Sequence, residues 1–498
     1  MNQLSKEDFL KLSQQGNLVP VYREILGDME TPVSAYLKLA GKSKYSFLLE
    51  SVEGGEKFAR FSFIARNPSL IVRSRGQQAQ IVRFHKGKVK KEDRDFKGSP
   101  LSIVRDLMKD YQAVNIAQLP RFYGGMVGYL SYDCVRFFER LPEKTKDDLQ
   151  LDDMVLMLAQ DLVIFDHRHR TIKVVSCVHC EPKESNAVKI QKYNAALKAI
   201  EGLIKDLQKP ATVKAGRRAR KQKLAVTSNC TQSRYKSMVA KAKEHITAGD
   251  IIQVVLSQRL SVKIAVEPLE IYRALRALNP SPYMFYLNCD GLQLVGASPE
   301  LLVRCENGLV ETRPIAGTRP RGETESKDEA LQKDLLADPK EKAEHVMLVD
   351  LGRNDLGRVC RQGTVKLSEF MAIEKYSHVM HIVSNVQGQL QPGKDALDVL
   401  EAAFPAGTVS GAPKIRAMEI IEDLEGLRRG PYAGCVGYFS FSKNLDMCIT
   451  IRTIVVRNQT AYVQAGAGIV ADSNPASEYK ETLNKAKAQI KAIELAHQ

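Results

Sequence analysis

The chain of 498 residues has a hydrophobic fraction of 44% and a charged fraction of 26%, which are typical of a soluble globular protein. This length predicts two or three domains or one large intertwined domain. The N-terminus has no basic segment followed by an apolar core, and the most apolar stretch, residues 154–165, is too short to span a bilayer. We therefore expect a cytoplasmic protein that does not bind membranes.

Almost half of the net charge of +15 comes from one segment, in which seven basic residues and no acidic residue lie between Lys209 and Lys223. Pro210 and Gly216 predict that this segment is an exposed connector. Such a connector can bind polyanions weakly, but no helix-turn-helix, zinc-finger or aromatic RNA-binding signature accompanies it. We therefore do not expect nucleic acid to be a partner. The nine scattered cysteines predict reduced, buried thiols.

Hydrophobic periodicity predicts both helices and strands on each side of the connector. In chain order we expect a helix at 33–40, strands at 70–73, 162–165 and 173–176, a helix at 193–207, a helix at 235–247, a strand at 254–260, a helix at 267–277, strands at 292–297 and 301–305, helices at 396–403 and 413–422, strands at 448–456 and 461–465, and a helix at 478–495. The strands come in turn-linked groups, which favours a mainly antiparallel α+β fold over a doubly wound parallel one.

The two parts of the chain echo each other. Residues 123–131 (YGGMVGYLS) match residues 432–440 (YAGCVGYFS), and residues 68–73 match residues 299–304 more faintly. This pattern predicts two related half-units packed together. We expect an N-terminal half at 1–208 that is interwoven with the rest, the basic connector at 209–229, and a catalytic part at 230–498.

Two acidic pairs, Glu341 with Glu344 and Glu478 with Glu481, each read as one turn of helix. Residues three apart lie on one helix face, so each pair points two carboxylates in one direction. An isolated pair of this kind is usually a solvated helix face. Two such faces meeting across a cleft would instead form an oxygen-rich site for a dication such as Mg²⁺.

Glycine-rich segments at 314–320, 404–414 and 464–470 lie in the same part of the chain. Glycines let backbone N–H groups approach a ligand closely, and Arg452 can bind a carboxylate through two hydrogen bonds. Together with the four carboxylates they predict a site with a metal at one end and anion donors at the other. The substrate implied is a small dianion or trianion that carries carboxylates.

These segments resemble those of the chorismate-utilising enzymes, and within that superfamily those of anthranilate synthase component I. Residues 344–357 (EHVMLVDLGRNDLG) and 408–414 (TVSGAPK) carry the resemblance most specifically, and the similarity runs from about Phe47 to Ala488. It implies a large sandwich of two antiparallel sheets with helices outside. It also implies conversion of chorismate and ammonia to anthranilate and pyruvate, the first step of tryptophan biosynthesis. The basic connector matches nothing in the family.

The resemblance also implies a role for each matching residue. Glu344 and Glu481 would hold Mg²⁺, with Glu341 and Glu478 in support. Glu300 would protonate the departing C4 hydroxyl of chorismate, and His381 would assist the leaving group or the later elimination. The remaining pocket residues implied are Thr318, Thr408, Tyr432, Arg452, Gly466, Ala467, Gly468 and Lys485.

Two positions distinguish the members of this superfamily. Gln253 stands where water-using relatives carry a lysine base, and an uncharged amide cannot deprotonate water but leaves room for ammonia. Ala316 stands where aminodeoxychorismate synthases carry a nucleophilic lysine, so ammonia should add at C2. The alternatives left open are an aminodeoxychorismate synthase and, from another class, a regulatory polyanion-binding protein that uses the connector.

The N-terminal half adds an expected effector site. Residues 48–51 (LLES) resemble the tryptophan-binding signature of the subfamily, and residues 282–284 complete it. The resemblance implies that Glu50, Ser51, Pro282, Tyr283 and Met284 bind tryptophan, which would inhibit the enzyme. The sequence shows no glutaminase nucleophile motif, so ammonia would come from a separate glutamine amidotransferase subunit, component II, in a heterotetramer.

Overall fold

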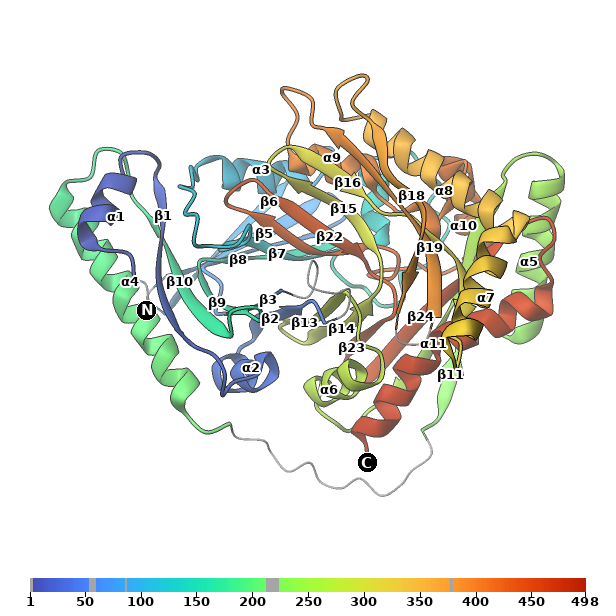
Figure 1. The fold of residues 1–498 in the computed structure, drawn as a ribbon, viewed down its shortest axis with the longest axis horizontal. Coiled ribbons are helices and arrows are strands. Elements are labelled where there is room, and N and C mark those ends of the chain that lie inside the picture. The colour runs from blue at the N-terminus through green and yellow to red at the C-terminus, as the bar shows by residue number, and fades with distance from the viewer. Residues whose placement is uncertain (1–2, 53–59, 86, 212–223, 377–378) are drawn as a thin grey trace.

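The computed structural model of the protein describes residues 3–52, 60–85, 87–211, 224–376 and 379–498. Most of the predicted basic connector, residues 212–223, lies outside these ranges. Within the described residues, two β-sheets of twelve strands each form the centre of the fold, with helices around them (Figure 1). One hydrophobic cluster takes side chains from both sheets, for example Leu48 and Val295 from one and Val127 and Val303 from the other. The predicted α+β sandwich is confirmed.

The first sheet, sheet A, pairs its strands antiparallel. Its order is β1 (Leu18–Leu26), β10 (Thr171–His179), β9 (Asp161–Asp166), β3 (Phe61–Arg66), β2 (Tyr45–Glu50), β13 (Tyr283–Cys289), β14 (Leu292–Ser298), β23 (Thr453–Arg457), β24 (Thr460–Ile469), β12 (Gln253–Lys263) and β11 (Val226–Ser228), and the short β20 (Gly411–Ala412) pairs with β12.

The second sheet, sheet B, is also antiparallel. Its order is β17 (Ile315–Pro320), β19 (Val379–Gln389), β16 (Leu309–Thr312), β15 (Leu301–Glu306), β22 (Leu445–Ile449), β21 (Cys435–Ser440), β7 (Gly125–Leu130), β8 (Met154–Ala159), β4 (Leu70–Arg75), β5 (Gln78–His85) and β6 (Lys88–Asp95), and β18 (Lys366–Lys375) pairs with β19.

The strand orders of the two halves of the chain match, as the similarity between residues 123–131 and 432–440 predicts. Strands from the two halves of the chain meet at β2 and β13 in sheet A and at β7 and β21 in sheet B. Outward from β7 come β8, β4 and β5, and outward from β21 come β22, β15 and β16, which hold the matching places in the second half. The two halves are therefore related by an approximate two-fold symmetry of strand order.

The nine-residue echo has a packing reason. Gly128 and Gly437 are directly opposite each other where β7 pairs with β21. A Cβ atom on Gly128 would lie 1.8 Å from the carbonyl oxygen of Val155, and one on Gly437 would lie 2.0 Å from that of Asp446. Each glycine thus lets its own strand approach the next strand of the same half closely, so both copies of the motif need glycine at this point.

Helices cover the sheets and gather at both ends of the molecule. In Figure 1, α1 and α4 lie at one end of the long axis, and α5, α7, α8, α10 and α11 lie at the other. The helices are α1 (Lys6–Leu12), α2 (Pro32–Ala40), α3 (Leu101–Lys109), α4 (Asn186–Gln208), α5 (Gln232–Thr247), α6 (Pro268–Leu278), α7 (Glu325–Ala337), α8 (Pro339–Gly357), α9 (Ala396–Ala403), α10 (Lys414–Glu425) and α11 (Pro475–Ala496), with 3-10 turns η1 (Tyr132–Phe137) and η2 (Gly407–Val409).

One predicted strand is wrong. The apolar run at 448–456 reads as a single strand, but β22 ends at Ile449 and β23 begins at Thr453. The chain changes from sheet B to sheet A between them, and Arg452 adopts a left-handed conformation with a φ of 52°. Periodicity cannot show this break because both flanking strands are buried and apolar.

Two expectations from composition can be compared with the fold. All nine cysteines are buried and unpaired, as predicted. Among the residues that the structure describes, we find no helix of the length and apolar character needed to cross a membrane.

Candidate active site

The first acidic turn lies near the start of α8. Asp338 caps this helix by accepting hydrogen bonds from the backbone N–H groups of Lys340 and Glu341. Glu341 forms an ion pair with Arg319 of β17 at 3.4 Å. A Cβ atom on Gly317 would lie 3.2 Å from a Glu341 oxygen, so this glycine lets β17 approach the helix closely. The predicted helical turn is confirmed, and α8 presents it toward sheet B.

The second acidic turn lies in the first turns of α11. Asn474 caps this helix by accepting hydrogen bonds from two backbone N–H groups, which fixes its start just before Glu478. Glu481 pairs with Lys485 one turn later, at 2.7 Å. Helix α11 packs on β24 and on α6 and so carries this turn toward sheet A. This turn of helix is also confirmed.

The two acidic turns act on each other electrostatically. Burial raises the pKa of Glu344, and the charges of Glu341 and Glu481 raise it further. Burial likewise raises the pKa of Glu478, with a contribution from Glu481. The side-chain amide of Gln253 donates a hydrogen bond to Glu344 at 3.3 Å. The fold has therefore brought together carboxylates from helices more than a hundred residues apart, at a cost in repulsion that a cation would remove.

These glutamates could supply only part of the ligand set of a Mg²⁺ ion. Among the described residues, no group of three or more His, Cys, Asp or Glu side chains is close enough to hold a metal by itself. Mg²⁺ is usually bound by only one or two carboxylates, together with waters and substrate oxygens. Glu344 and Glu481 are suited to such a shared site, in which the substrate completes the ligand set.

The predicted anion-binding end is built around Arg452. This residue occupies the break between β22 and β23, and its guanidinium donates a hydrogen bond to the carbonyl of Lys485 at 2.7 Å. Burial lowers the pKa of Arg452, although nearby Tyr432, Glu481 and Glu300 oppose that shift. The hydrogen bond joins the arginine to α11, and its charge acts on both Glu481 and the predicted acid, Glu300.

The glycines of β24 leave space for two side chains of the predicted site. A Cβ atom on Gly466 would lie 2.7 Å from the Tyr432 hydroxyl, and one on Gly468 would lie 2.4 Å from the Gln253 amide nitrogen. Lys485 donates a hydrogen bond to the Gly466 carbonyl at 3.2 Å. The side chain of Ala467 lies in a hydrophobic cluster instead, so what this residue could offer a ligand is its backbone.

Glu300 is held at the turn between β14 and β15. Ser298 donates a hydrogen bond to the carbonyl of Ile449 at 2.7 Å, and the Ile449 N–H donates to the carbonyl of Glu300 at 3.1 Å. The residue is 8% exposed. Burial raises the pKa of Glu300 to about 7, against the opposing effects of Thr408, Lys485 and Arg452. A carboxyl group that keeps its proton near neutral pH can act as a general acid.

Thr318 and His381 face each other across β17 and β19. The Nδ1 atom of His381 lies 2.8 Å from the Gly317 carbonyl oxygen and 3.1 Å from the Thr318 hydroxyl. A carbonyl oxygen only accepts, so Nδ1 carries the proton and Nε2 of the neutral ring is left as an acceptor. Burial lowers the pKa of His381, with a further contribution from Arg452.

The two residues predicted to select the product also lie in these strands. Gln253 begins β12 and is 3% exposed. Its side-chain oxygen is buried and has no hydrogen-bond partner among the described residues. Ala316 lies in β17, one residue before Gly317, and its side chain is buried. The structure thus leaves one unused acceptor at the position where we expect ammonia.

Sequence reasoning missed an ion pair that joins the two most specific motif blocks. The ammonium group of Lys414, at the start of α10, lies 2.8 Å from both oxygens of Asp355 on α8. The pair fastens the segment that contains Thr408 to the helix that carries Glu344. Nothing in the local sequence pattern pairs these residues, which are 59 positions apart.

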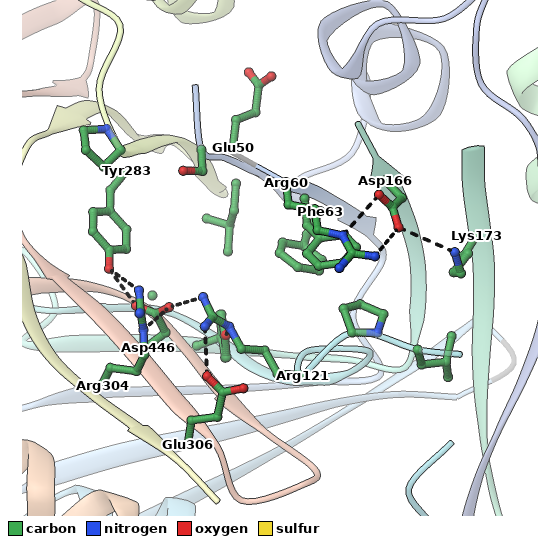
Figure 2. Close-up of a pocket in the computed structure, with 18 of the residues that line it drawn as sticks. Glu50, Arg60, Phe63, Arg121, Asp166, Lys173, Tyr283, Arg304, Glu306 and Asp446 are labelled. Carbon is green, nitrogen blue, oxygen red and sulfur yellow. Dashed lines mark hydrogen bonds and ion pairs between the residues drawn. The ribbon is translucent and has the colours of Figure 1, made fainter. Parts of the chain in front are cut away.

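A second cavity, of about 720 Å³, lies where the two halves meet, and the five predicted effector residues all line it (Figure 2). Tyr283 donates a hydrogen bond from its hydroxyl to Asp446 at 3.0 Å. Asp446 also accepts hydrogen bonds from Arg121 at 3.0 Å and Arg304 at 3.1 Å. This wall of the cavity therefore joins β13 of sheet A to β22 of sheet B.

The carboxylate of Glu50 points away from this cavity in Figure 2. It accepts two hydrogen bonds from Arg276 of α6, at 3.0 and 3.1 Å, and one from the Tyr272 hydroxyl. Met284 is opposite Glu50 in the sheet register and so shares its face. Tyr283, the residue before Met284 in β13, presents its side chain to the cavity wall, whereas the part of Glu50 that lines the cavity is not its carboxylate.

Comparison with known proteins identifies the family of this chain. Residues 55–491 match the family model described as chorismate binding enzyme. Anthranilate synthase component 1 of Aquifex aeolicus (strain VF5) is 50% identical over 99% of this chain and 98% of its own length. The chain belongs to the anthranilate synthase component 1 family of chorismate binding enzymes. The member of this family from Acetivibrio thermocellus is 49% identical over 97% of both chains.

Solved structures of other proteins share the fold of this chain. Anthranilate synthase component I from Streptococcus pneumoniae TIGR4 matches with a TM-score of 0.74 and 36% identity, over 93% of this chain and 98% of that one. The menaquinone-specific isochorismate synthase from Escherichia coli matches with a TM-score of 0.67 over 98% of both chains. At 18% identity this second likeness shows a shared fold alone.

Proposed function

We propose that this chain converts chorismate and ammonia to anthranilate, pyruvate and water. The observation that carries the proposal is Glu300, a buried acid with a pKa of about 7 beside Arg452, Lys485 and Thr408. An acid, anion donors and paired carboxylates in one pocket suit a substrate that has two carboxylates and a hydroxyl leaving group.

The side chains of the pocket divide the substrate between them. Arg452, Tyr432 and the amides around Gly466 and Gly468 bind the enolpyruvyl carboxylate. The ring carboxylate lies toward Glu344 and Glu481, with Glu341 and Glu478 in support. Mg²⁺, when bound there, offsets the negative charge that the substrate and these glutamates bring together. Thr318 and Lys485 complete the pocket.

The first chemical step joins ammonia to C2 as the C4 hydroxyl leaves. The two ring double bonds shift as the C2–N bond forms, and Glu300 gives its proton to the C4 hydroxyl, which departs as water. The ammonium group formed at C2 releases one proton to solvent, and Glu300 is reprotonated from solvent before the next turnover. The unpaired side-chain oxygen of Gln253 accepts an N–H of ammonia and so directs the nitrogen lone pair toward C2. The uncharged amide cannot act as a base toward water, which favours the amino product.

The second step releases pyruvate and forms the aromatic ring. C2 loses a proton, the bond between C3 and the ether oxygen breaks, and the enolpyruvyl group leaves and is protonated to pyruvate. His381 suits the proton removal, because its Nε2 atom is an unprotonated acceptor in the neutral ring. Thr318 helps to hold this tautomer by its contact with Nδ1.

Two further proposals concern ammonia supply and control. The component 1 names of the relatives imply a second component, and we propose that a glutamine amidotransferase subunit supplies ammonia within a heterotetramer in the cytoplasm. We also propose that tryptophan binds the cavity lined by Glu50, Ser51, Pro282, Tyr283 and Met284 and inhibits the enzyme.

The test is incubation of the purified chain with chorismate, Mg²⁺ and an ammonium salt at alkaline pH, followed by anthranilate fluorescence. Aminodeoxychorismate or salicylate as the product would refute the assignment. Glu344→Gln and Glu481→Gln should abolish Mg²⁺-dependent turnover while the fold survives, whereas Glu494→Gln, an exposed position on the same helix as Glu481, should have no effect. Calorimetric titration of Mg²⁺ in the presence of chorismate would show whether the two variants lose metal binding.

A further inference from the structure

A buried ion pair, Arg429 with Glu425, lies behind the pocket. Glu425 is the last residue of α10, and Arg429 follows it by four residues. The Arg429 side chain is 1% exposed and the Glu425 side chain is 5% exposed. The guanidinium donates to both carboxylate oxygens, at 2.9 and 2.6 Å. We call Arg429, Glu425 and Ser257, whose contacts follow, the Arg429 clamp.

The remaining donors of Arg429 bind backbone carbonyls next to predicted site residues. Its Nη1 atom donates to the Val409 carbonyl and its Nη2 atom to the Val255 carbonyl, both at 2.7 Å. Val409 directly follows Thr408, and Val255 lies two residues after Gln253. One planar group therefore fixes the distance between the Thr408 segment and the strand that carries Gln253.

Glu425 extends the clamp to the strand that carries the pocket glycines. Its Oε1 atom accepts hydrogen bonds from the backbone N–H of Ser257 at 2.7 Å and from the Ser257 hydroxyl at 2.9 Å. The Ser257 oxygen in turn accepts a hydrogen bond from the Gln464 amide at 2.8 Å. Gln464 lies two residues before Gly466 on β24.

Two tyrosine rings also lie next to the guanidinium of Arg429. Its carbon lies 5.5 Å from the centre of the Tyr432 ring and 4.7 Å from that of the Tyr132 ring. Tyr432 is a predicted substrate-binding residue, and Tyr132 comes from η1 in the N-terminal half. Besides Glu425, the contacts of Arg429 described above therefore reach a predicted site residue (Tyr432), backbone close to two others (Val409 and Val255) and the N-terminal half (Tyr132).

We propose that Arg429 is a positioning residue for the reaction, an inference that rests on the proposed function. It touches no substrate. It holds the backbone beside Thr408, Gln253 and Gly466, and the ring of Tyr432, in a single arrangement. Arginine is required because its rigid fork binds two carbonyls and a carboxylate at once, whereas lysine presents a single nitrogen. Loss of the fork would leave buried carbonyls unpaired and let these segments shift.

A second buried ion pair on the same helix provides a matched control. Arg136 pairs with Glu422 of α10 at 2.6 Å, and their side chains are 11% and 6% exposed. The other partners of Glu422 are Lys144 and Thr145, which belong to the N-terminal half and do not adjoin the pocket. Arg136 also pairs with Asp133, which accepts a hydrogen bond from the Gly430 N–H at 2.9 Å, but it shares no hydrogen-bond partner with Arg429. Replacing this arginine should therefore weaken the fold and leave the hydrogen bonds of Arg429 in place.

The experiment compares Arg429→Lys, Arg136→Lys and the wild-type chain in chorismate consumption, with the melting temperature measured for each. We expect kcat of Arg429→Lys to fall about 100-fold with KM for chorismate nearly unchanged, because small misplacements of reacting groups act mainly on the chemical step. Arg136→Lys should lower the melting temperature by a similar amount and keep kcat within about twofold of the wild type, since it disturbs packing alone.

Equal kcat values for the two variants would overturn the proposal. If Arg429→Lys does not fold, Ser257→Ala is the deciding variant, because it removes one hydrogen bond to Glu425 and the acceptor of Gln464. A loss of kcat of about tenfold, which corresponds to one hydrogen bond, supports the proposal. An unchanged kcat overturns it. A wild-type chain that consumes chorismate but yields another product refutes the proposed function and leaves the comparison of variants valid. A wild-type chain that consumes no chorismate overturns both.

Discussion

Replacement of Glu300 by glutamine gives the sharpest test of the proposed chemistry. Burial raises the pKa of this carboxyl from 4.5 to about 7. The acid form is needed in the first step, and a group with this pKa is about nine-tenths protonated at pH 6 and about one-tenth at pH 8. The wild-type kcat/KM for chorismate should therefore fall roughly tenfold over this range. Glu300→Gln should lose about 10²–10⁴-fold in rate and show no such slope.

The assay must separate the pH dependence caused by Glu300 from that caused by ammonia, which is also protonated over this range. Total ammonium is adjusted at each pH so that the concentration of free ammonia is constant, and an inert salt holds the ionic strength. Chorismate is kept well below KM, so that the initial rate of anthranilate fluorescence gives kcat/KM and reports the free enzyme. A flat wild-type profile between pH 6 and pH 8, or the same slope in Glu300→Gln, would refute the reasoning.

Thermal stability gives a second measure of Glu300 that does not depend on turnover. Its pKa is higher in the folded than in the unfolded chain. Its contribution to the free energy of unfolding is therefore complete below the unfolded value of 4.5 and is lost as pH rises through about 7. The difference between these two pKa values corresponds to about 3 kcal/mol. The melting temperature of Glu300→Gln relative to the wild type should therefore rise between pH 5 and pH 8. An unchanged difference would contradict the buried, protonated acid.

Three further changes have specific expected results. Gly437→Ala should lower the free energy of unfolding by about 3 kcal/mol, because its Cβ would meet a carbonyl oxygen at 2.0 Å. Gly202→Ala is the control, because this glycine lies in open space on α4, and it should raise the free energy of unfolding by about 0.5–1 kcal/mol. Denaturant unfolding measures both. Gln253→Lys should admit some water addition, seen by mass spectrometry in isotopically labelled water; an exclusively aminated product would show that this position does not choose the nucleophile. Ser51→Leu should raise the tryptophan concentration needed for half-inhibition about tenfold by filling the effector cavity, with kcat unchanged as the control.

Local patterns carried a large share of the fold. Spacing alone predicted that Glu341 and Glu344, and Glu478 and Glu481, lie on helical turns, and both turns are present. Apolar runs predicted eight strand segments, and seven of them lie within single strands among the twenty-four that the described residues form. The prediction failed at residues 448–456, where two buried strands of different sheets follow each other and the change of direction at Arg452 has no hydrophobic signature.

The sequence by itself determined the residue types of the site, the family to which the chain belongs and the echo between its halves, since these depend on local spacing and on motifs. Only the tertiary structure decided the surroundings of those residues. The pKa of Glu300 depends on burial by segments distant in sequence. The carboxylate of Glu50 binds α6, and Arg429 joins the turn η2, strand β12 and the end of helix α10. Desolvation and hydrogen bonding are set by three-dimensional neighbours, and no periodicity along the chain encodes which neighbours those will be.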